Sequence, residues 1–430
     1  MNRLADLEKP MKLASLPPWL EAETTQAVFQ LIHNAGHVVR VVGGCVRDTL
    51  LSASGSPDID MATTMLAQDL MDLCRTKDMQ CLPTGLSHGT VTLRLFSRDG
   101  TPHTFEVTTL RKDIATDGRH AEVAFTDDWL EDAKRRDLTI NALYMDAIGQ
   151  VYDPLAAIDQ SGLTDLKQTR IRFIGDAEAR IQEDYLRILR FFRFHYRFAP
   201  DQAMDAHGLA ACITFRSGLD QLSRERVRGE LLSLLALSNF GDAVIGLNKH
   251  DVMEHILGMK ITPDRNMIER LSGLNVGCDP ILRLGVLLNH GREVMSVRDA
   301  LRLSNAETSR LGHLWDEMLQ RDILGCRNQP DDLFVVCYRY SAQAVMDQLV
   351  YIWIKFDTAP ANAQALLLQL AKWERPDFPL SGQDFLNNDY AAGPELGEAF
   401  KAYEDQWARS HFKLTRDELL SRLLSDKAGQ

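Results

Sequence analysis

The feature that most constrains this chain is VVRVVGGCVRDTLLSASGSPDIDMAT (38–63), in which a strand, a glycine turn, a helix and an acidic strand follow one another. The β-branched run at 38–42 predicts a strand that stops at a Gly-Gly pair, and residues 46–51 have the spacing of a helix. Such a turn lets a polyphosphate approach the backbone at Gly44, with helix N–H groups directed at it and Arg47 close enough to pair with it.

The acidic strand carries Asp58 and Asp60, which alternate with the apolar residues Ile59 and Met61. Because side chains alternate along a strand, both carboxylates are expected on one face. At about 4 Å such a pair repels by roughly 4 kcal/mol at an effective dielectric of 20. Mg²⁺, which binds carboxylates together with nucleotide phosphates, is the natural counterion. Asp-x-Asp also occurs by chance in many chains, and then it implies no metal.

A third acid follows on another predicted strand. Residues 91–95 alternate, Asp99-Gly100 is a hairpin signal, and residues 104–110 alternate again. In the second strand Glu106 lies on the face opposite the apolar side chains, and is available beside the aspartate strand. The local alternative is an exposed strand glutamate without a role.

Two polar segments come next. Residues 112–122 (KDIATDGRHAE) have no apolar period, and we expect a mobile loop. In DAKRRDLTINALYMD (132–146), two arginines and an aspartate precede an apolar run, so the segment is either the start of a helix with a solvated charge cluster or part of a binding site.

Residues 176–198 (DAEARIQEDYLRILRFFRFHYRF) contain no Gly or Pro, and we expect one continuous helix. Asp184, Arg187 and Arg190 fall on one face, surrounded by apolar side chains. Buried arginines without partners cost several kcal/mol. Two alternatives remain open from these residues alone: a structural ion-pair network, or a slot that a ligand completes.

The order GGCVRD, then DID, resembles the nucleotidyltransferase superfamily that includes DNA polymerase β. More narrowly, it resembles the branch of class II CCA-adding enzymes and bacterial poly(A) polymerases. The resemblance implies that Asp58 and Asp60 are catalytic and hold Mg²⁺, and that Glu106 is the third catalytic acid. RRDxTxNA is similar to the motif that selects ribonucleotides, which implies Arg136 on the nucleotide and Asp137 near the sugar hydroxyl, with Asn141 supporting the turn.

EDYLRILRFFRF resembles the E-D-x-x-R motif of class II CCA-adding enzymes, in which the Asp and Arg act as a protein template for the incoming base. The resemblance implies this role for Asp184 and Arg187, and implies that Arg190 and Arg193 reach the triphosphate or brace the template. The residues SRERVRGE (223–230) resemble the next family motif, a helix that supports the template helix. The flexible-loop signature of the family, implicated in switching from C to A, is matched by Asp117, Gly118 and Arg119.

The resemblance covers nearly the whole chain and implies an α+β fold. A nucleotidyltransferase head with a polymerase β-like mixed sheet and helices (1–153) is expected, followed by an all-α neck with the base-selecting helix (154–235), a body (236–355) and a tRNA-binding tail (356–430). The implied function is template-independent addition of CCA to the 3′ end of tRNA from CTP and ATP, with release of pyrophosphate. The implied mechanism is in-line attack assisted by two Mg²⁺ ions.

Composition limits the partners and the compartment. The formal net charge is −12, which disfavours non-specific binding of nucleic acid, so RNA requires a local basic surface. Residues 170–197 supply one, with seven arginines against four acids. Seven scattered cysteines without a CxxC pair indicate reduced thiols. We expect a cytoplasmic protein without a membrane partner, since no long apolar run or signal peptide is found.

Three alternatives remain. A poly(A) polymerase on the same scaffold shares the acids and RRDxTxNA, and an enzyme that adds only A keeps the Asp-Gly-Arg loop. The intact loop speaks against an enzyme that adds only CC. An inactive RNA-binding or scaffold protein of the same fold is disfavoured by the intact Asp58, Asp60 and Arg187.

Overall fold

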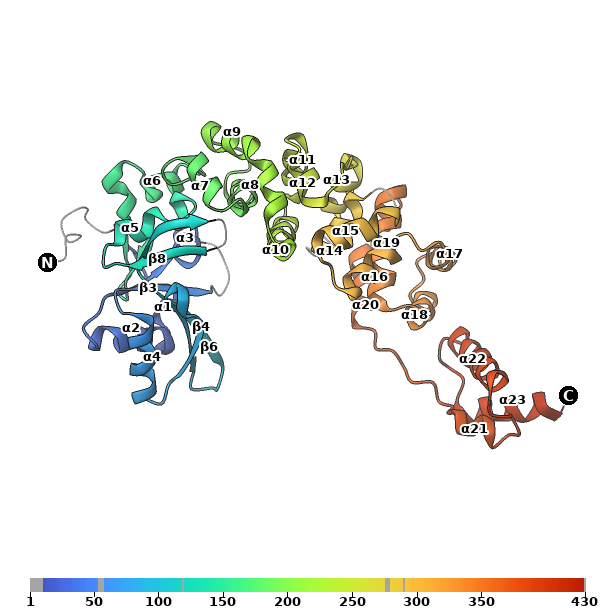
Figure 1. Cartoon of the computed structure of the whole chain (residues 1–430). Coiled ribbons are helices and arrows are strands. Elements are labelled where there is room, and N and C mark those ends of the chain that lie inside the picture. Colours follow the sequence, from blue (N-terminus) through green and yellow to red (C-terminus); the bar gives the residue numbers. More distant parts are fainter. Residues whose placement is uncertain (1–10, 53–57, 118–119, 275–278, 289–290, 429–430) are drawn as a thin grey trace. The chain divides into compact units, whose positions relative to one another are not determined.

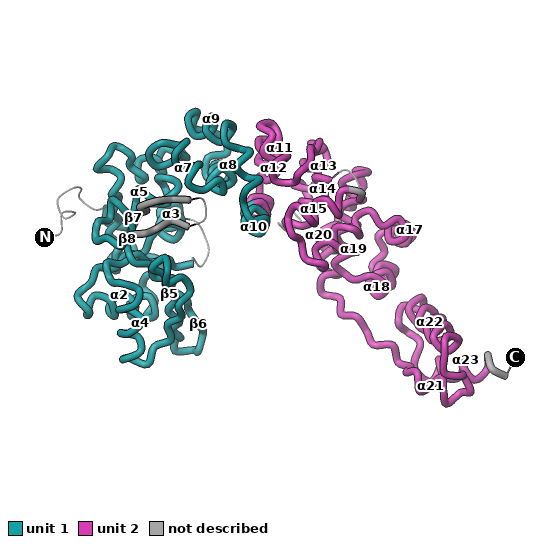
Figure 2. Tube along the Cα trace, viewed as in Figure 1, with its two compact units in different colours: residues 1–230 teal, residues 231–430 magenta. Residues whose placement is uncertain are grey.

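The structure, a computed structural model, describes residues 11–52, 58–117, 120–274, 279–288 and 291–428. The chain divides into two compact units, residues 1–230 and residues 231–430, which Figure 2 draws in different colours. The finer division predicted from the sequence, with boundaries after residues 153, 235 and 355, stays a prediction.

Unit 1 is built on a mixed sheet of eight strands among the described residues, in the spatial order β1-β10-β9-β2-β3-β6-β5-β4. The pair β3 and β6 is parallel, and the other neighbouring pairs are antiparallel. The predicted mixed sheet is therefore confirmed. Its strands are β1 (Met11–Lys12), β2 (Val39–Val42), β3 (Ile59–Thr63), β4 (Gln80–Gly85), β5 (Thr90–Phe96), β6 (Pro102–Thr109), β9 (Tyr144–Met145) and β10 (Gln150–Tyr152).

Strand pairing brings the glycine turn and the acids to one end of the sheet. Since β2 and β3 are antiparallel, with Val41 opposite Met61, the end of β2 lies beside the start of β3. The turn that follows β2 is therefore next to Asp60. Because β3 and β6 are parallel and pair Asp60 with Glu106, these two acids project from the same face.

Helices with apolar stripes pack onto this sheet and its ends (Figure 1). Helix α2 buries Val28 and Ile32, and α4 buries Leu70 and Cys74, so one face of each helix meets the core in successive turns. The α-helices of unit 1 are α1 (Pro18–Glu21), α2 (Glu23–Asn34), α3 (Gly44–Leu50), α4 (Ala67–Thr76), α5 (Trp129–Lys134), α6 (Gly162–Lys167), α7 (Ala177–Glu183), α8 (Leu186–Phe198), α9 (Ala206–Thr214) and α10 (Arg224–Leu235), the last of which continues past residue 230. Short 3₁₀ helices are η1 (Leu86–His88), η2 (Thr139–Asn141), η3 (Pro154–Ile158) and η4 (Arg216–Gln221).

The loop predicted for residues 112–122 is wrong, because the structure has a two-stranded hairpin there. Strands β7 (Arg111–Asp117) and β8 (His120–Phe125) pair from Arg111 with Phe125 to Asp117 with His120. The antiparallel ladder satisfies the backbone N–H and C=O groups without any need for an apolar side-chain period. Gly118 and Arg119 lie outside the described residues.

The single helix predicted for residues 176–198 is also wrong, because it is interrupted at Asp184. This residue has φ −156° and ψ 105°, an extended conformation, and separates α7 from α8. Its Oδ1 accepts from the N–H of Leu186 at 3.1 Å and its C=O accepts from the N–H of Arg187 at 3.0 Å, so Asp184 opens α8. The Arg180 carbonyl, near the end of α7, accepts instead from Nη1 of Arg187 at 3.0 Å.

A distant contact accounts for the interruption. The ring of Tyr185 lies against Gly218 so closely that an ideal β-carbon on that glycine would be 2.1 Å from Tyr185 Cδ1. Helix propensity favours one continuous helix, but tertiary packing overrides propensity. The break therefore depends on a glycine that the local sequence of α7 and α8 does not contain.

Unit 2 is α-helical throughout its described residues, and no strand follows β10 in the described part of the chain. The predicted fold class is confirmed. An aromatic cluster that includes Tyr338, Phe385 and Trp407 forms the core of its C-terminal part. Within the described residues no helix has the length and apolarity needed to cross a membrane. The helices of unit 2 are α11 (Phe240–Lys249), α12 (Val252–Leu257), α13 (Arg265–Gly273), α14 (Pro280–Leu287), η5 (Gly291–Glu293), α15 (Val294–Leu301), α16 (Asn305–His313), α17 (Glu317–Gly325), α18 (Pro330–Arg339), α19 (Ala342–Phe356), α20 (Ala363–Lys372), α21 (Gly382–Leu386), α22 (Pro394–Arg409) and α23 (Arg416–Ala428).

The contact between Tyr185 and Gly218 generates a stability prediction. Gly218→Ala should lower the free energy of unfolding by about 1–3 kcal/mol, because the added methyl group overlaps the ring of Tyr185. Gly229→Ala, in α10, is the matched control: nothing lies within 4 Å of its ideal β-carbon. That variant should be as stable as the parent or gain up to about 1 kcal/mol. Urea unfolding of the full-length chain measures both, and similar values for the two variants would contradict the packing account.

Candidate active site

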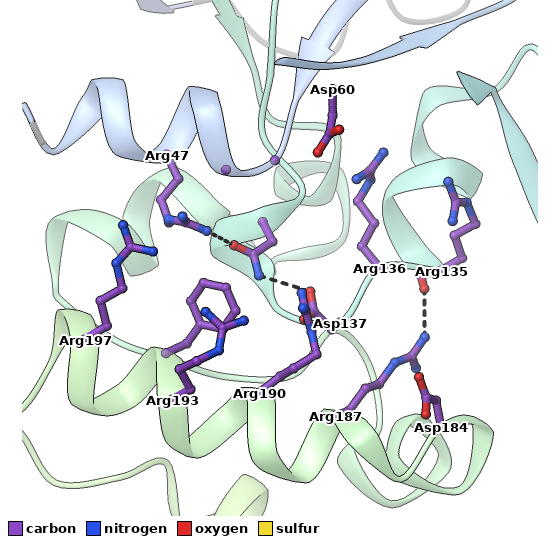
Figure 3. A pocket seen from close by; sticks show the side chains of 14 residues that line it. Arg47, Asp60, Arg135, Arg136, Asp137, Asp184, Arg187, Arg190, Arg193 and Arg197 are labelled. Carbon is purple, nitrogen blue, oxygen red and sulfur yellow. Dashed lines mark hydrogen bonds and ion pairs between the residues drawn. The ribbon is translucent and has the colours of Figure 1, made fainter. Parts of the chain in front are cut away.

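A cavity of about 380 Å³ lies in unit 1, beside α8 and the start of β3 (Figure 3). Seven arginines and three aspartates line it, so the side chains around the cavity carry an excess of positive charge. The lining residues are Gly43, Gly44, Arg47, Asp60, Arg135, Arg136, Asp137, Asn141, Asp184, Arg187, Arg190, Arg193, Phe194 and Arg197.

The predicted catalytic acids are neighbours, although only one lines the cavity. Asp60 faces it, Asp58 immediately precedes β3, and Glu106 is the partner of Asp60 in the β3–β6 ladder. Loss of water around Asp60 and the charge of Glu106 raise its carboxyl pKa to about 6, with a smaller effect from Asp58, while Arg136 opposes the shift. The carboxylates therefore repel one another, as expected from the sequence, and a cation would relieve that repulsion.

The carboxylates beside the cavity suit a divalent ion that takes its remaining ligands from water and from a substrate. Among the described residues, no three Asp, Glu, His or Cys side chains converge into a complete metal cage. Mg²⁺ in proteins commonly takes one or two carboxylates, with water and substrate phosphates as its remaining ligands. Asp60 with one neighbouring carboxylate fits that arrangement, beside a cavity rich in arginine.

The glycine turn brings the backbone close to the cavity. Gly43 has φ +78°, and an ideal β-carbon there would be 3.7 Å from the Asn141 carbonyl oxygen and 3.9 Å from Nη1 of Arg136. A side chain at this position would be strained and would narrow the cavity. The predicted turn thus places Gly44 in the cavity lining.

Arg47 is buried and tied to its neighbours. Its Nε donates to Oδ1 of Asp48 at 2.8 Å, and its Nη1 donates to the side-chain oxygen of Asn141. The rings of Phe194 and Phe198 lie beneath its guanidinium group. The side chain is 4% exposed. Arg47 therefore joins α3 to the RRDxTxNA segment and to α8, and these contacts fix the walls of the cavity.

The RRDxTxNA segment contributes two adjacent charges. Arg136 donates from Nη2 to Oδ2 of Asp132 at 3.0 Å, and Tyr144 donates to the same oxygen at 2.7 Å. Asp137 is buried and accepts from Arg190 Nε at 2.6 Å and Asn141 Nδ2 at 3.1 Å. Burial raises the carboxyl pKa of Asp137, but the charge and hydrogen bond of Arg190 outweigh it, and the net result is a pKa lowered to about 2.

Asp184 and Arg187 lie at the junction of α7 and α8, in the lining of the same cavity as Asp60. Asp184 Oδ2 accepts from Arg226 at 2.7 Å, so the 223–230 segment does contact the predicted base-reading pair. Arg187 donates from Nη1 to Glu183 at 2.6 Å. Its Nη2 donates to the carbonyl of Arg135 at 3.1 Å (Figure 3). Both side chains are therefore held in place by the protein.

Along α8 two arginines share one carboxylate. Glu230, which is nearly buried, accepts from Nε of Arg193 at 2.7 Å and from Nη1 of Arg190 at 3.4 Å. Phe194 lies beneath both guanidinium groups, 4.6 Å from that of Arg193 and 5.4 Å from that of Arg190. Because Arg190 is also paired with Asp137, Glu230 links the two arginines and orients both guanidinium groups. The arginines of α8 thus form an ion-pair network and also line a cavity, so the two alternatives considered for them from the sequence do not exclude one another.

The structure places most of the predicted site residues in this cavity and a few elsewhere. Asp117 ends β7. Arg135, Phe194 and Arg197 line the cavity although they were not predicted as site residues. Arg135 belongs to the RRDxTxNA motif, and Arg197 continues the spacing of three and four residues along α8. That periodicity is the signal by which Arg197 could have been found.

Known proteins resemble this chain over nearly its whole length. The family model described as the poly A polymerase head domain matches residues 39–172. The mitochondrial CCA tRNA nucleotidyltransferase 1 of Danio rerio is 34% identical over 391 residues, which is 90% of this chain and 86% of the relative. The human protein of the same name is 32% identical over 413 residues, or 94% of this chain and 90% of the relative.

The chain belongs to the family of CCA tRNA nucleotidyltransferases. It is accordingly a nucleotidyltransferase, and the resemblance noted from its motifs is confirmed. The solved structure of the Bacillus stearothermophilus CCA-adding enzyme in complex with CTP has a TM-score of 0.73 at 22% identity, over 96% of this chain and 99% of that one. This likeness shows that the nucleotidyltransferase has the same fold along its length.

The Asp137–Arg190 pair generates a pH prediction for this nucleotidyltransferase. Because the folded pKa of Asp137 lies below the unfolded value of about 3.9, its ionisation stabilises the fold above pH ~4, and this contribution is lost as the pH falls toward 2. Arg190→Met leaves a buried carboxylate without its cation, and should lower the free energy of unfolding by roughly 3 kcal/mol at pH 7. The deficit should shrink as the pH falls from 7 to 4, since protonation removes the uncompensated charge.

The matched control is Arg75→Met, which breaks an exposed pair with Asp72 at 2.7 Å. That variant should change stability by less than about 1 kcal/mol at every pH. Urea unfolding of the full-length chain at pH 7, 6, 5 and 4 measures both variants. An Arg190→Met deficit that does not change with pH would contradict the assignment of the effect to Asp137.

Proposed function

We propose that the protein completes the 3′ CCA end of tRNA by adding nucleotides from CTP and ATP, with release of pyrophosphate. The observation that supports this most is one cavity lined both by Asp60, from the acidic strand, and by Asp184 and Arg187, from the start of α8. Nucleotidyl transfer needs charge neutralisation near the reacting phosphate, and untemplated addition of a defined base needs protein groups that read the base. The residues proposed for these two tasks line a single cavity.

We propose Mg²⁺ as the divalent ion, held by Asp58 and Asp60 with help from Glu106. Nucleotidyltransferases of this kind generally use divalent metal ions. When bound, the ion would lower the pKa of the terminal 3′-hydroxyl and neutralise the leaving pyrophosphate. Arg136, whose charge acts on Asp60, would bind the nucleotide beside it. Arg190 and Arg193 would bind the triphosphate, with their guanidinium groups oriented by Asp137 and Glu230.

The base would be read by Asp184 and Arg187. A carboxylate accepts and a guanidinium donates, so the pair complements a base edge that offers an N–H donor beside a ring-nitrogen acceptor. Cytosine and adenine both offer such an edge, whereas guanine and uracil offer a carbonyl acceptor beside an N–H donor. Glu183 and Arg226 hold the two reading groups, which limits the loss of side-chain entropy when a base binds.

Three further assignments belong to the same proposal: the tRNA-binding unit, the compartment and the residues of the specificity switch. The helical unit 2 would bind tRNA through the segments predicted as body and tail, and the four predicted domains would divide the work between chemistry and tRNA binding. The cytoplasm is proposed as the compartment, although the two animal relatives are named as mitochondrial. Asp117, Gly118 and Arg119 would act in the switch from C to A.

A poly(A) polymerase on the same scaffold is the second candidate, and the match of residues 39–172 to the poly A polymerase head domain favours it. Incubation of the full-length protein with tRNA that lacks CCA, in the presence of CTP and ATP, separates the two candidates. We expect C, C and A to be added and synthesis then to stop. A long A tract would support the poly(A) polymerase, and addition of A alone would support an A-adding enzyme.

The same assay tests the acids. Asp60→Asn should reduce incorporation by at least about 1,000-fold, because it removes a ligand from an ion that supplies several kcal/mol of transition-state stabilisation. Asp69→Asn, on α4 and away from the cavity lining, should retain activity. Equal far-UV circular dichroism of the two variants would show that both are folded. Retained incorporation by Asp60→Asn would remove the proposed mechanism.

Base choice generates a separate prediction. Asp184→Asn places an N–H donor where the carboxylate accepts, so discrimination of CTP and ATP against UTP and GTP should fall by about 5- to 150-fold, the value of one good bidentate base contact. The ratio of kcat/KM values for CTP and UTP measures this. Asp176→Asn, a residue that caps α7 through the same atom type, is the control and should leave the ratio unchanged. A uniform fall for all four nucleotides would assign Asp184 a structural role instead.

A further inference from the structure

We propose that Arg197, which none of the motifs identifies, binds the terminal phosphates of the incoming nucleoside triphosphate together with Arg193. This inference rests on the proposed function, since it assigns a place in the cavity to the leaving part of the substrate.

Position along α8 supports the assignment. Arg187, Arg190, Arg193 and Arg197 are spaced by three, three and four residues, and all four line the cavity. Figure 3 shows these side chains extending from one side of α8 toward Arg47 and Asp60. Ten residues of helix rise by about 15 Å, so the row is long enough to follow a nucleotide from its base to its last phosphate. If the base lies at the Arg187 end, the terminal phosphates lie toward Arg197.

The charges around Arg197 are not balanced by the protein. Its Nη2 donates to Oδ2 of Asp48 at 3.1 Å, while Oδ1 of the same carboxylate accepts from Arg47. One carboxylate is thus shared by two guanidinium groups. Burial lowers the pKa of Arg47, Asp48 opposes this shift, and repulsion from Arg197 and Arg193 adds to it. An anion between these three groups would replace repulsion with attraction.

Arg197 also has donors to spare. In the described part of the chain its guanidinium donates to Asp48 alone, and its side chain is 38% exposed. Arg193 uses Nε and Nη2 for Glu230, which leaves Nη1 available. Phe198 lies 4.7 Å below the guanidinium of Arg197 and restricts its orientation. Two oriented guanidinium groups with unused N–H groups are the donors that adjacent phosphates require.

The chemistry explains why this contact matters. In the proposed reaction the 3′-oxygen of the RNA forms a bond to the α-phosphorus, and its proton passes to solvent. The bond from the α-phosphorus to the bridging oxygen breaks, and pyrophosphate leaves with that electron pair. Arg197 and Arg193 would stabilise the charge that develops on the leaving group.

The test is equilibrium binding to the full-length protein with Mg²⁺ and without RNA, so that no turnover occurs. Isothermal titration calorimetry with CTP, CMP and inorganic pyrophosphate is measured for the wild type and Arg197→Gln. Loss of one charge-assisted contact should weaken CTP and pyrophosphate by about 10- to 100-fold, and CMP by less than about 2-fold. Arg197→Lys, which keeps the charge without the planar fork, should give an intermediate loss for CTP and pyrophosphate.

The matched control is Arg170→Gln, which removes a half-exposed arginine paired with one aspartate, Asp205, at 3.0 Å. That variant should bind all three ligands as the wild type does. If Arg197→Gln weakens CTP and CMP equally, or weakens neither CTP nor pyrophosphate, the proposal is wrong. CMP binding also reports whether the cavity is still folded. Failure of the wild type to add CCA to tRNA would overturn the proposed function, and it is read in a different assay.

Discussion

The ion pair between Asp137 and Arg190 is the interaction on which the candidate site depends. Asp137 belongs to the RRDxTxNA segment, which directly follows α5. Arg190 lies in the second turn of α8, 53 residues further along the chain. Their atoms approach to 2.6 Å, and the carboxylate is buried. Breaking a buried pair is unfavourable because it leaves an uncompensated charge. The pair therefore holds α8 against the RRDxTxNA segment, which lines the cavity beside Asp60. The acids and the base-reading residues can then act on one ligand.

Sharing of carboxylates explains how an acidic chain presents a basic cavity. Asp48 is shared by Arg47 and Arg197, Asp132 by Arg135 and Arg136, and Glu230 by Arg190 and Arg193. Each carboxylate orients two guanidinium groups. One positive charge is left over in the Asp48 set and in the Asp132 set, whereas in the Glu230 set Arg190 also pairs with Asp137 and the charges balance. Full neutralisation would leave nothing to attract a triphosphate, and an absence of acids would leave long side chains without a fixed orientation. The net charge of −12 belongs to the whole chain and does not describe this cavity.

The parts of the fold that follow from local pattern could be predicted, and those that depend on distant contacts could not. Alternation predicted Asp60 and Glu106 each on the face of its strand opposite the apolar side chains. The glycine turn was predicted from a β-branched run that stops at two glycines. The interruption at Asp184 depends on Gly218, 34 residues away in sequence, so no property of the helix itself could predict it. The β7–β8 hairpin was missed for a different reason: its pairing uses backbone N–H and C=O groups, and these leave no period in the side-chain pattern of residues 112–122.

The interrupted helix is also what makes base selection physically reasonable. In a continuous helix the N–H of residue 184 would be bonded to the carbonyl of Arg180, and the side chain of Asp184 would project from the helix surface with several rotamers available. In the structure its Oδ1 is bonded to the N–H of Leu186 and its Oδ2 to Arg226, while the carbonyl of Arg180 takes a hydrogen bond from Arg187. The groups that the break frees are thus satisfied by the two residues proposed to read the base. A base that matches them gains its hydrogen bonds with little reorganisation, and a base with the reversed pattern leaves polar groups unpaired, which costs about 1–3 kcal/mol for each buried group.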